Sequence, residues 1–404
     1  MNPRLSLLHP YPFERLRELT RDITPNPGHR PIGLGIGEPR HATPEFIRRA
    51  LIEGFCGLST YPPTLGTPAL RQAIAAWVQR RYGVPVCPDT QVLPVSGSRE
   101  ALFSFAQAVI DGSREGATVV CPNPFYQIYE GAALLAGAQT AFANSDPTRN
   151  FAPDWNQIDE ATWARAQLVY VCSPGNPSGA VMPLGEWQRL FELSDRHGFV
   201  IASDECYSEI YFRDEDPPLG GLQAARALGR DDYRRLVAFT SLSKRSNVPG
   251  MRSGFVAGDA RLMKSYLQYR TYHGAALSPM VQHASVAAWS DEAHVAHNRA
   301  LYRAKFEQVT PMLADVLDVR LPDAAFYLWA GVPGGDDIEY ARGLLAQYNV
   351  TVLPGSLLAR DAHGANPGAG RVRLALVAEP AECVEAAQRI VAYTRAYRPG
   401  HPSR

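Results

Sequence analysis

The sequence predicts an α/β fold with a large domain, whose mostly parallel sheet is flanked by helices, and a smaller α/β domain. Three observations support this. Short apolar runs alternate with helix-like segments from about residue 95 to residue 260. The runs are rich in Val, Ile and Phe without strict polar alternation, which is typical of strands covered on both faces. After about residue 285 the order of elements changes, so a second, smaller layer follows.

The predicted strands of the large domain are TVVC (118–121), LVYVC (168–172), FVIASD (199–204), LVAFTS (236–241) and GFVAG (254–258). The helices predicted between them cover 98–110, 126–137 and 184–198. The first of these helices has apolar residues at helical spacing, namely Ala101, Leu102, Phe105, Ala108 and Val109. A strand–helix alternation of this kind favours parallel strands.

The smaller domain is predicted from the C-terminal part of the chain. Its expected elements are a helix over 291–317, a strand pair within 318–332, a helix over 337–347, a strand over 350–354, a Gly/Pro loop over 361–370, a strand over 371–377 and a closing helix. We therefore expect a large domain over 46–285 and a small domain over 286–404. Residues 1–45, rich in Pro and Gly, are predicted to form an N-terminal arm and part of the small domain.

Composition narrows the class of protein. Lys+Arg and Asp+Glu both number 40, so nothing favours nucleic acid or an acidic membrane surface as a partner. The N-terminus lacks the apolar core of a signal peptide. The six cysteines are scattered without metal-ligand spacing. We expect a cytoplasmic protein with no disulfide and no bound metal.

Chemistry-bearing side chains follow the predicted strands, at the edge where ligands bind in open α/β sheets. Asn176 follows the second run, and Asp204 ends the third with Tyr207 three residues on. Lys244 follows the fourth run, and its amine can form a Schiff base with an aldehyde. Pyridoxal phosphate carries such an aldehyde, and its ring nitrogen needs a carboxylate partner.

The phosphate of that cofactor needs hydroxyls, a guanidinium or a helix N-terminus. Such groups lie around Lys244 and at the start of helix 98–110, namely Ser241, Ser243, Arg252, Gly97, Ser98 and Arg99. Tyr126, after CPNPF, is expected to stack on the ring. Each feature also has an ordinary interpretation: a surface lysine, a helix cap, a turn at NPSG. Their order and placement at strand ends favour the cofactor site.

The motifs SLSKRSNVPGMRSGF, SPGNPSG and SDECYSEIYF stand in the order found in fold-type I pyridoxal-phosphate aminotransferases of the class I/II group, which the chain resembles over nearly its whole length. The resemblance implies that Lys244 forms the Schiff base and moves the substrate proton, and that Asp204 pairs with the pyridinium nitrogen. It also implies that Tyr207 and Asn176 hydrogen-bond the phenolic oxygen of the cofactor and that Tyr126 stacks on the face of its ring. It places the phosphate on Gly97, Ser98, Arg99, Ser241, Ser243 and Arg252.

The same resemblance implies that the active site is shared between two subunits. Tyr61, in STYPPTLGTPAL, matches the tyrosine that reaches the phosphate in the partner subunit, so a homodimer is expected. Arg373 matches the arginine that binds the substrate α-carboxylate. Gly37 matches a backbone contact to the same carboxylate, with Asn176 beside it.

A finer resemblance, in GIGEPRHATP, STYPPTLGTPALRQAI and KRSNVPG, is to the succinyldiaminopimelate aminotransferases of bacterial lysine biosynthesis. It implies ping-pong transfer of the glutamate amino group to N-succinyl-2-amino-6-oxopimelate, giving N-succinyl-LL-2,6-diaminopimelate. Candidates for binding the distal carboxylate are Arg40, His41, Arg99 and Arg245. Three alternatives stay open: another class I/II aminotransferase (aspartate, alanine, kynurenine or aromatic), a pyridoxal-phosphate carbon–sulfur β-lyase, and a non-catalytic ligand sensor.

Overall fold

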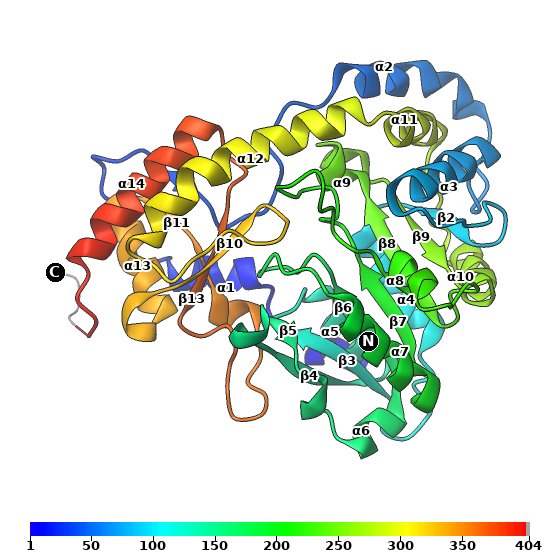
Figure 1. Cartoon of the computed structure of the whole chain (residues 1–404), viewed down its shortest axis with the longest axis horizontal. Coiled ribbons are helices and arrows are strands. Elements are labelled where there is room, and N and C mark those ends of the chain that lie inside the picture. Colours follow the sequence, from blue (N-terminus) through cyan, green and yellow to red (C-terminus); the bar gives the residue numbers. More distant parts are fainter. Residues whose placement is uncertain (401–404) are drawn as a thin grey trace.

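The computed structural model describes residues 1–400. Within them, an eight-stranded sheet has the order β2-β9-β8-β7-β6-β3-β4-β5 (Figure 1). Its strands are β2 (Val92–Val95), β3 (Thr118–Asn123), β4 (Gln139–Asp146), β5 (Ala152–Pro153), β6 (Ala166–Cys172), β7 (Val200–Asp204), β8 (Leu236–Ser241) and β9 (Gly254–Gly258). The five from β8 to β4 pair in parallel, whereas β2, β9 and β5 pair antiparallel. The predicted mostly parallel α/β sheet is confirmed, with β2, β4 and β5 as strands outside the predicted runs.

Helices bury both faces of this sheet, which explains why its strands are apolar without alternation. One face carries α4 (Ser98–Val109), α5 (Ile128–Ala136) and α10 (Ala260–His273), and the other carries α3 (Pro68–Tyr82), α7 (Leu184–His197) and α8 (Gly221–Ala227). Two consecutive residues of β7 show that both faces of the sheet are buried. Val200 packs in the α4–α5–α10 cluster and Ile201 in the α3–α7–α8 cluster, because successive strand residues point to opposite faces.

A second, three-stranded antiparallel sheet has the order β10-β13-β12. Its strands are β10 (Tyr327–Gly331), β12 (Leu353–Pro354) and β13 (Arg371–Ala375). The helices α12 (Ala293–Ala314), α13 (Asp337–Tyr348) and α14 (Pro380–Ala396) pack with it. Nearby, β1 (Ile32–Gly33) and β11 (Val350–Thr351) form a separate parallel pair, which joins the N-terminal segment to this layer.

Two predicted elements of this layer are wrong. The segment 318–332 forms one strand, β10, and the rest of the predicted pair is reduced to a single antiparallel bridge between Asp318 and Gly331. The amides of Ala324 and Ala325 donate to the carbonyls of Gly179 and Ile210 at 3.0 and 2.8 Å, so this stretch pairs with loops outside the layer. The predicted strand over 350–354 is divided between β11 and β12, which belong to different sheets.

The N-terminal residues are integrated with the rest of the chain. Helix α1 (Pro12–Leu19) packs through Leu16 against Leu353, Leu357 and Leu358, and α2 (Glu45–Glu53) lies against α11 (Pro279–Ser290). Figure 1 shows α12 running from the end of α11, beside the large sheet, across to the small layer. The boundaries at residues 45 and 285 stay a proposal. Among residues 1–400, no helix is long and apolar enough to cross a membrane.

Candidate active site

The carboxyl ends of β6, β7 and β8 open onto a cavity of about 510 Å³. These ends lie level in the sheet, since Cys172 pairs with Asp204 and Asp204 pairs with Phe239. Most of the predicted site residues line this cavity, namely Gly37, Ser98, Arg99, Tyr126, Asn176, Asp204, Tyr207, Ser241, Ser243, Lys244, Arg252 and Arg373. Segments separated by more than 300 residues in sequence therefore meet at one sheet edge, as strand-end placement predicts.

Lys244 presents its amine to the cavity from the short helix α9 (Leu242–Arg245), directly after β8. Its Nζ donates a hydrogen bond to the Gly37 carbonyl at 2.9 Å. Burial, with a smaller contribution from the charges of Arg373 and Arg252, lowers the pKa of this amine to about 8. A larger share of Lys244 is therefore neutral near neutral pH, which is the form that attacks a carbonyl carbon.

Asp204 lies buried at the end of β7, at the floor of the cavity. Its Oδ2 accepts from the Tyr129 hydroxyl at 2.8 Å, and its Oδ1 accepts from the Cys206 amide at 3.3 Å. Burial raises the pKa of this carboxyl, whereas these two hydrogen bonds act in the opposite direction. The Tyr129 ring stacks on Tyr170 with centroids 4.4 Å apart, which fixes the donor.

One corner of the cavity is built for an anion. The Ser241 and Ser243 hydroxyls lie 2.8 Å apart, and Arg252 Nη1 donates to Ser243 Oγ at 3.5 Å and to the Pro249 carbonyl at 3.0 Å. These partners are neutral. Gly97, just before α4, has φ +87°, and a Cβ there would lie 2.1 Å from Arg252 Nη2. Only glycine allows the guanidinium to lie against the start of α4, whose free amides also favour anions.

Arg373, on β13, is a second guanidinium with neutral partners. It is 3% exposed, and it donates to Asn176 Oδ1 and to the Gly35 carbonyl, both at 2.8 Å. It lies over the Tyr327 ring at 4.4 Å, and within residues 1–400 its buried Nε has no hydrogen-bond partner. A buried cation with spare donors at a cavity wall suits a carboxylate ligand.

Arg99 reaches the cavity from the first turn of α4. Its Nε donates to the Tyr126 hydroxyl at 2.5 Å and its Nη2 donates to the Tyr11 hydroxyl at 3.4 Å. The guanidinium carbon lies 5.8 Å from both ring centroids. Of the four candidates for the distal carboxylate, Arg99 is the one among residues 1–400 that lines this cavity.

The other three candidates lie outside the cavity, so the prediction that one of them binds the distal carboxylate is wrong. Arg40 Nη1 lies 3.5 Å from Glu382 Oε1 in a half-exposed ion pair. The ring of His41 bonds the Asn298 side chain at 2.8 Å. Arg245 is 1% exposed and its guanidinium is directed away from the cavity, with Glu292 Oε1 2.7 Å from Nη2.

Tyr61 lies fully exposed and outside the cavity of its own chain. The prediction that it reaches the site of a second subunit stays a prediction. It is flanked by further exposed apolar side chains on α2 and the turn after it, namely Ile52, Phe55 and Leu58.

Several lining residues escaped the sequence reasoning. Tyr11 and Phe13 come from the N-terminal segment, and Tyr327 bonds the Tyr207 hydroxyl at 2.9 Å. Cys206 also lines the cavity, with its Sγ 2.9 Å from Ser98 Oγ. The aromatic stretch HPYPF was the available signal for Tyr11 and Phe13.

The arrangement fits pyridoxal phosphate. The partly buried Lys244 amine can bond its aldehyde, and the floor carboxylate of Asp204 can face its ring nitrogen. The cradle of Gly97 and Arg252, where a Cβ has no room, matches a phosphate held close to the backbone. Among residues 1–400, no group of acidic, His and Cys side chains could hold a metal ion.

Comparison with known proteins agrees with this site. Residues 29–390 match the family model described as aminotransferase class I and II. The LL-diaminopimelate aminotransferase of Nitratidesulfovibrio vulgaris is 32% identical over 392 residues, which cover 96% of this chain and 97% of that protein.

Solved structures are similar over almost the whole chain. An aminotransferase from Neisseria meningitidis superimposes with a TM-score of 0.95 at 55% identity, covering 98% of this chain and 100% of that one. A probable N-succinyldiaminopimelate aminotransferase from Thermus thermophilus superimposes with a TM-score of 0.84 at 26% identity, covering 94% and 99%.

Proposed function

Because this chain belongs to the class I and II aminotransferases, which use pyridoxal 5′-phosphate, we propose that it moves the amino group of glutamate to N-succinyl-2-amino-6-oxopimelate. The observation that carries the proposal is the pair of guanidinium groups, Arg373 and Arg99, that line one cavity with Lys244. Glutamate and the succinylated substrate each carry an α-carboxylate and a second, distant carboxylate. Two cations in the cavity suit substrates of this kind.

We assign the cofactor contacts to the residues that form the floor and the anion corner. When bound, the cofactor supplies an electron sink for the carbanion formed at the substrate Cα. Asp204 holds the ring nitrogen protonated, and Asn176 and Tyr207 donate to the phenolic oxygen. Tyr126 covers the ring face. The phosphate lies among the backbone of Gly97, Ser98 and Arg99 and the side chains of Ser241, Ser243 and Arg252, which leaves the Arg99 guanidinium for the substrate.

The substrate is bound between the two arginines. Arg373 binds the α-carboxylate, aided by the backbone at Gly37, and its hydrogen bond to Asn176 fixes the guanidinium plane. Arg99 binds the distal carboxylate, since its two present partners are neutral hydroxyls that an anion can displace. The Lys244 amine removes the proton from the substrate Cα, and its lowered pKa suits that role.

We also propose a homodimer whose subunits share their active sites. The support is the fully exposed Tyr61 ring, which follows the exposed apolar side chains of Ile52, Phe55 and Leu58 in the chain. A second subunit would bury this surface and place Tyr61 at the anion corner of its neighbour. Sedimentation analysis of the wild type and of Tyr61→Ala, together with their cofactor affinities, tests this. A monomeric active enzyme would contradict it.

A second candidate substrate is LL-diaminopimelate itself, because that substrate is named for relatives about 30% identical over most of the chain. The two candidates differ in the distal group. N-succinyl-LL-2,6-diaminopimelate carries an extra carboxylate in place of a free amine. A cavity wall carrying Arg99 favours the succinylated compound, because a guanidinium repels a free ammonium.

The test is a panel of amino donors with 2-oxoglutarate as acceptor. We expect the highest kcat/KM for N-succinyl-LL-2,6-diaminopimelate. A higher value for LL-diaminopimelate would select the second candidate. A preference for aspartate, alanine, kynurenine or phenylalanine would select another aminotransferase of the family. Pyruvate and ammonia released from cystathionine without an acceptor would indicate the β-lyase.

A further inference from the structure

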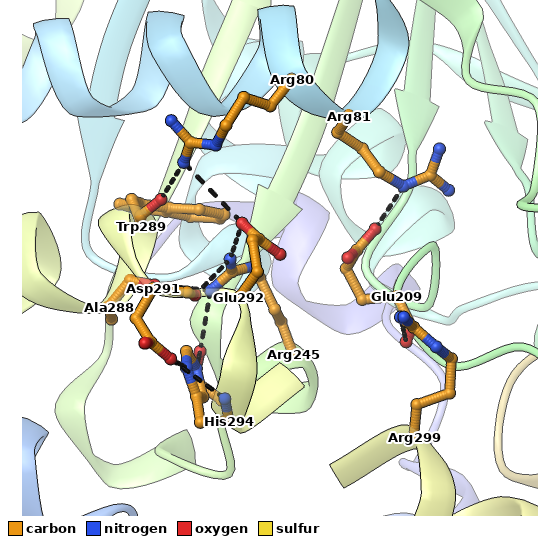
Figure 2. A network of polar contacts seen from close by, with 11 residues as sticks. Arg80, Arg81, Glu209, Arg245, Ala288, Trp289, Asp291, Glu292, His294 and Arg299 are labelled. Carbon is orange, nitrogen blue, oxygen red and sulfur yellow. Dashed lines mark hydrogen bonds and ion pairs between the residues drawn. The ribbon is translucent and has the colours of Figure 1, made fainter. Parts of the chain in front are cut away.

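Arg245 directly follows Lys244 in the chain, yet it lies buried on the side away from the cavity. Its guanidinium lies beside two indole rings that pack against each other, 5.6 Å from the Trp77 centroid and 5.0 Å from the Trp289 centroid. Figure 2 shows it among Trp289, Asp291 and Glu292. Burying a cation costs free energy unless its donors are satisfied. The hydrogen-bond partners of Arg245 therefore indicate the structural role of its guanidinium.

The partners lie at the junction between α11 and α12, apart from one neighbouring hydroxyl. Nη1 donates to the Ala288 carbonyl at 2.7 Å and to Ser246 Oγ at 3.3 Å. Nη2 donates to the Asp291 carbonyl at 3.2 Å and to Glu292 Oε1 at 2.7 Å. The last carbonyls of a helix have no partner within it and carry partial negative charge, so Arg245 caps the C-terminus of α11.

The residues on either side of Arg245 contact the same junction. Ser246 Oγ lies 2.8 Å from His294 Nε2, and the Asn247 amide donates to Asn298 Oδ1 at 2.8 Å. The Asn298 amide in turn donates to the Lys244 carbonyl at 3.2 Å. His294 and Asn298 are four residues apart on α12 and so share one face of it. Four consecutive residues, 244–247, are thus bonded to this junction.

These contacts fix Lys244 from the side opposite its amine. On the other side, β8 ends at Ser241 within the sheet, three residues before Lys244. The helix α9 between them has only four residues, so its own hydrogen bonds define its direction poorly. The junction also begins α12, the helix that Figure 1 shows running across to the layer that carries Arg373.

We propose that Arg245 is a positioning residue, which fastens the Lys244 peptide to the α11–α12 junction and so keeps the amine aligned in the cavity. This rests on the proposed function, in which the Lys244 amine must reach the proton on the substrate Cα. An amine displaced by about 1 Å loses rate even when the substrates still bind, and such losses reach ~10²-fold. Arg245 touches neither the cofactor site nor the substrate site.

The experiment compares Arg245→Met with Arg80→Met in the cofactor-loaded enzyme. Arg80 is a control at the same helix end, because its Nη2 donates to the Trp289 carbonyl at 2.7 Å and lies 3.8 Å from Glu292 Oε1, a partner of Arg245, without touching 244–247. We expect Arg245→Met to lower kcat by ~10- to 100-fold with both KM values within about twofold. It should also reduce the visible circular dichroism of the cofactor, which depends on how the ring is held. Arg80→Met should leave both unchanged.

The proposal is overturned if folded Arg245→Met keeps the wild-type kcat, or if both variants lose kcat in proportion to their melting temperatures. Should Arg245→Met fail to fold, Arg245→Lys decides, because it keeps the charge but not the four hydrogen bonds. Lowered kcat with unchanged KM supports the proposal, and wild-type kcat overturns it. Failure of the proposed function looks different, since the wild type itself would then be inactive with every amino donor.

Discussion

Removal of one hydroxyl, in Tyr129→Phe, should change the pH dependence of the enzyme while leaving its structure intact. The Tyr129 hydroxyl donates to Asp204 Oδ2 at 2.8 Å, and both groups are buried. The phenylalanine ring can keep the stacking on Tyr170, so the substitution removes the donor without opening a large cavity. Asp204 keeps its contacts with Cys206, including the longer bond from the Cys206 amide at 3.3 Å.

The size and sign of the effect follow from that geometry. A hydrogen bond to a charged group contributes about 1.5–3 kcal/mol, and one pKa unit corresponds to about 1.4 kcal/mol. Burial already raises the pKa of Asp204, and the Tyr129 donor favours the ionised form. Loss of the donor should therefore make ionisation of Asp204 less favourable and raise its pKa further. Since Asp204 must be ionised to hold the ring nitrogen protonated, the acid limb of kcat/KM moves to higher pH.

The assay is kcat/KM for N-succinyl-LL-2,6-diaminopimelate from about pH 5 to about pH 9. Tyr170→Phe is the matched control, because its hydroxyl donates to the Leu102 carbonyl at 2.6 Å and not to Asp204. We expect the acid limb of Tyr129→Phe to lie above those of the wild type and the control, with activity regained at high pH. Coincident acid limbs in all three proteins would refute the reasoning.

Two further substitutions separate the parts of the site, and a third tests a buried ion pair outside it. Arg99→Met should lower kcat/KM by ~10- to 100-fold for substrates with a distal carboxylate but not for alanine, and equal losses would argue against a distal contact. Gly97→Ala should weaken cofactor retention in equilibrium dialysis, because its Cβ meets the Arg252 guanidinium; unchanged retention would show that the cradle is dispensable. Arg81→Met should cost about 3–5 kcal/mol in urea unfolding, because it leaves the buried Glu209, now 2.5 Å from Arg81 Nε, unpaired; a loss below about 1 kcal/mol would contradict this.

The strand-end residues of the site could be predicted because their placement is local. Asp204 and Lys244 follow apolar runs that become β7 and β8, and parallel strands bring such ends to one edge. The direction of Arg245 could not be predicted. In a four-residue helix, neighbouring side chains point to different sides, and the distant α11–α12 junction decides which side each occupies.

The error in the predicted fold also arises from contacts between segments that are distant in sequence. The stretch 318–332 has the composition of a strand pair, but the amides of Ala324 and Ala325 find carbonyls elsewhere in the chain. Tyr61 poses a related problem, because its expected partner is a second subunit and its exposed ring has no role within one chain. Non-local pairing therefore set the limit of what the sequence pattern could predict.

The central claim, that this cavity transfers an amino group with the help of Lys244, is tested most directly in a single half-reaction. Cofactor-loaded enzyme is mixed with glutamate in the absence of any acceptor, and 2-oxoglutarate and ammonia are measured. We predict 2-oxoglutarate in amounts equal to the active sites, no free ammonia, and no measurable product from Lys244→Ala. Continuous release of ammonia, or a wild-type rate in Lys244→Ala, would contradict the account.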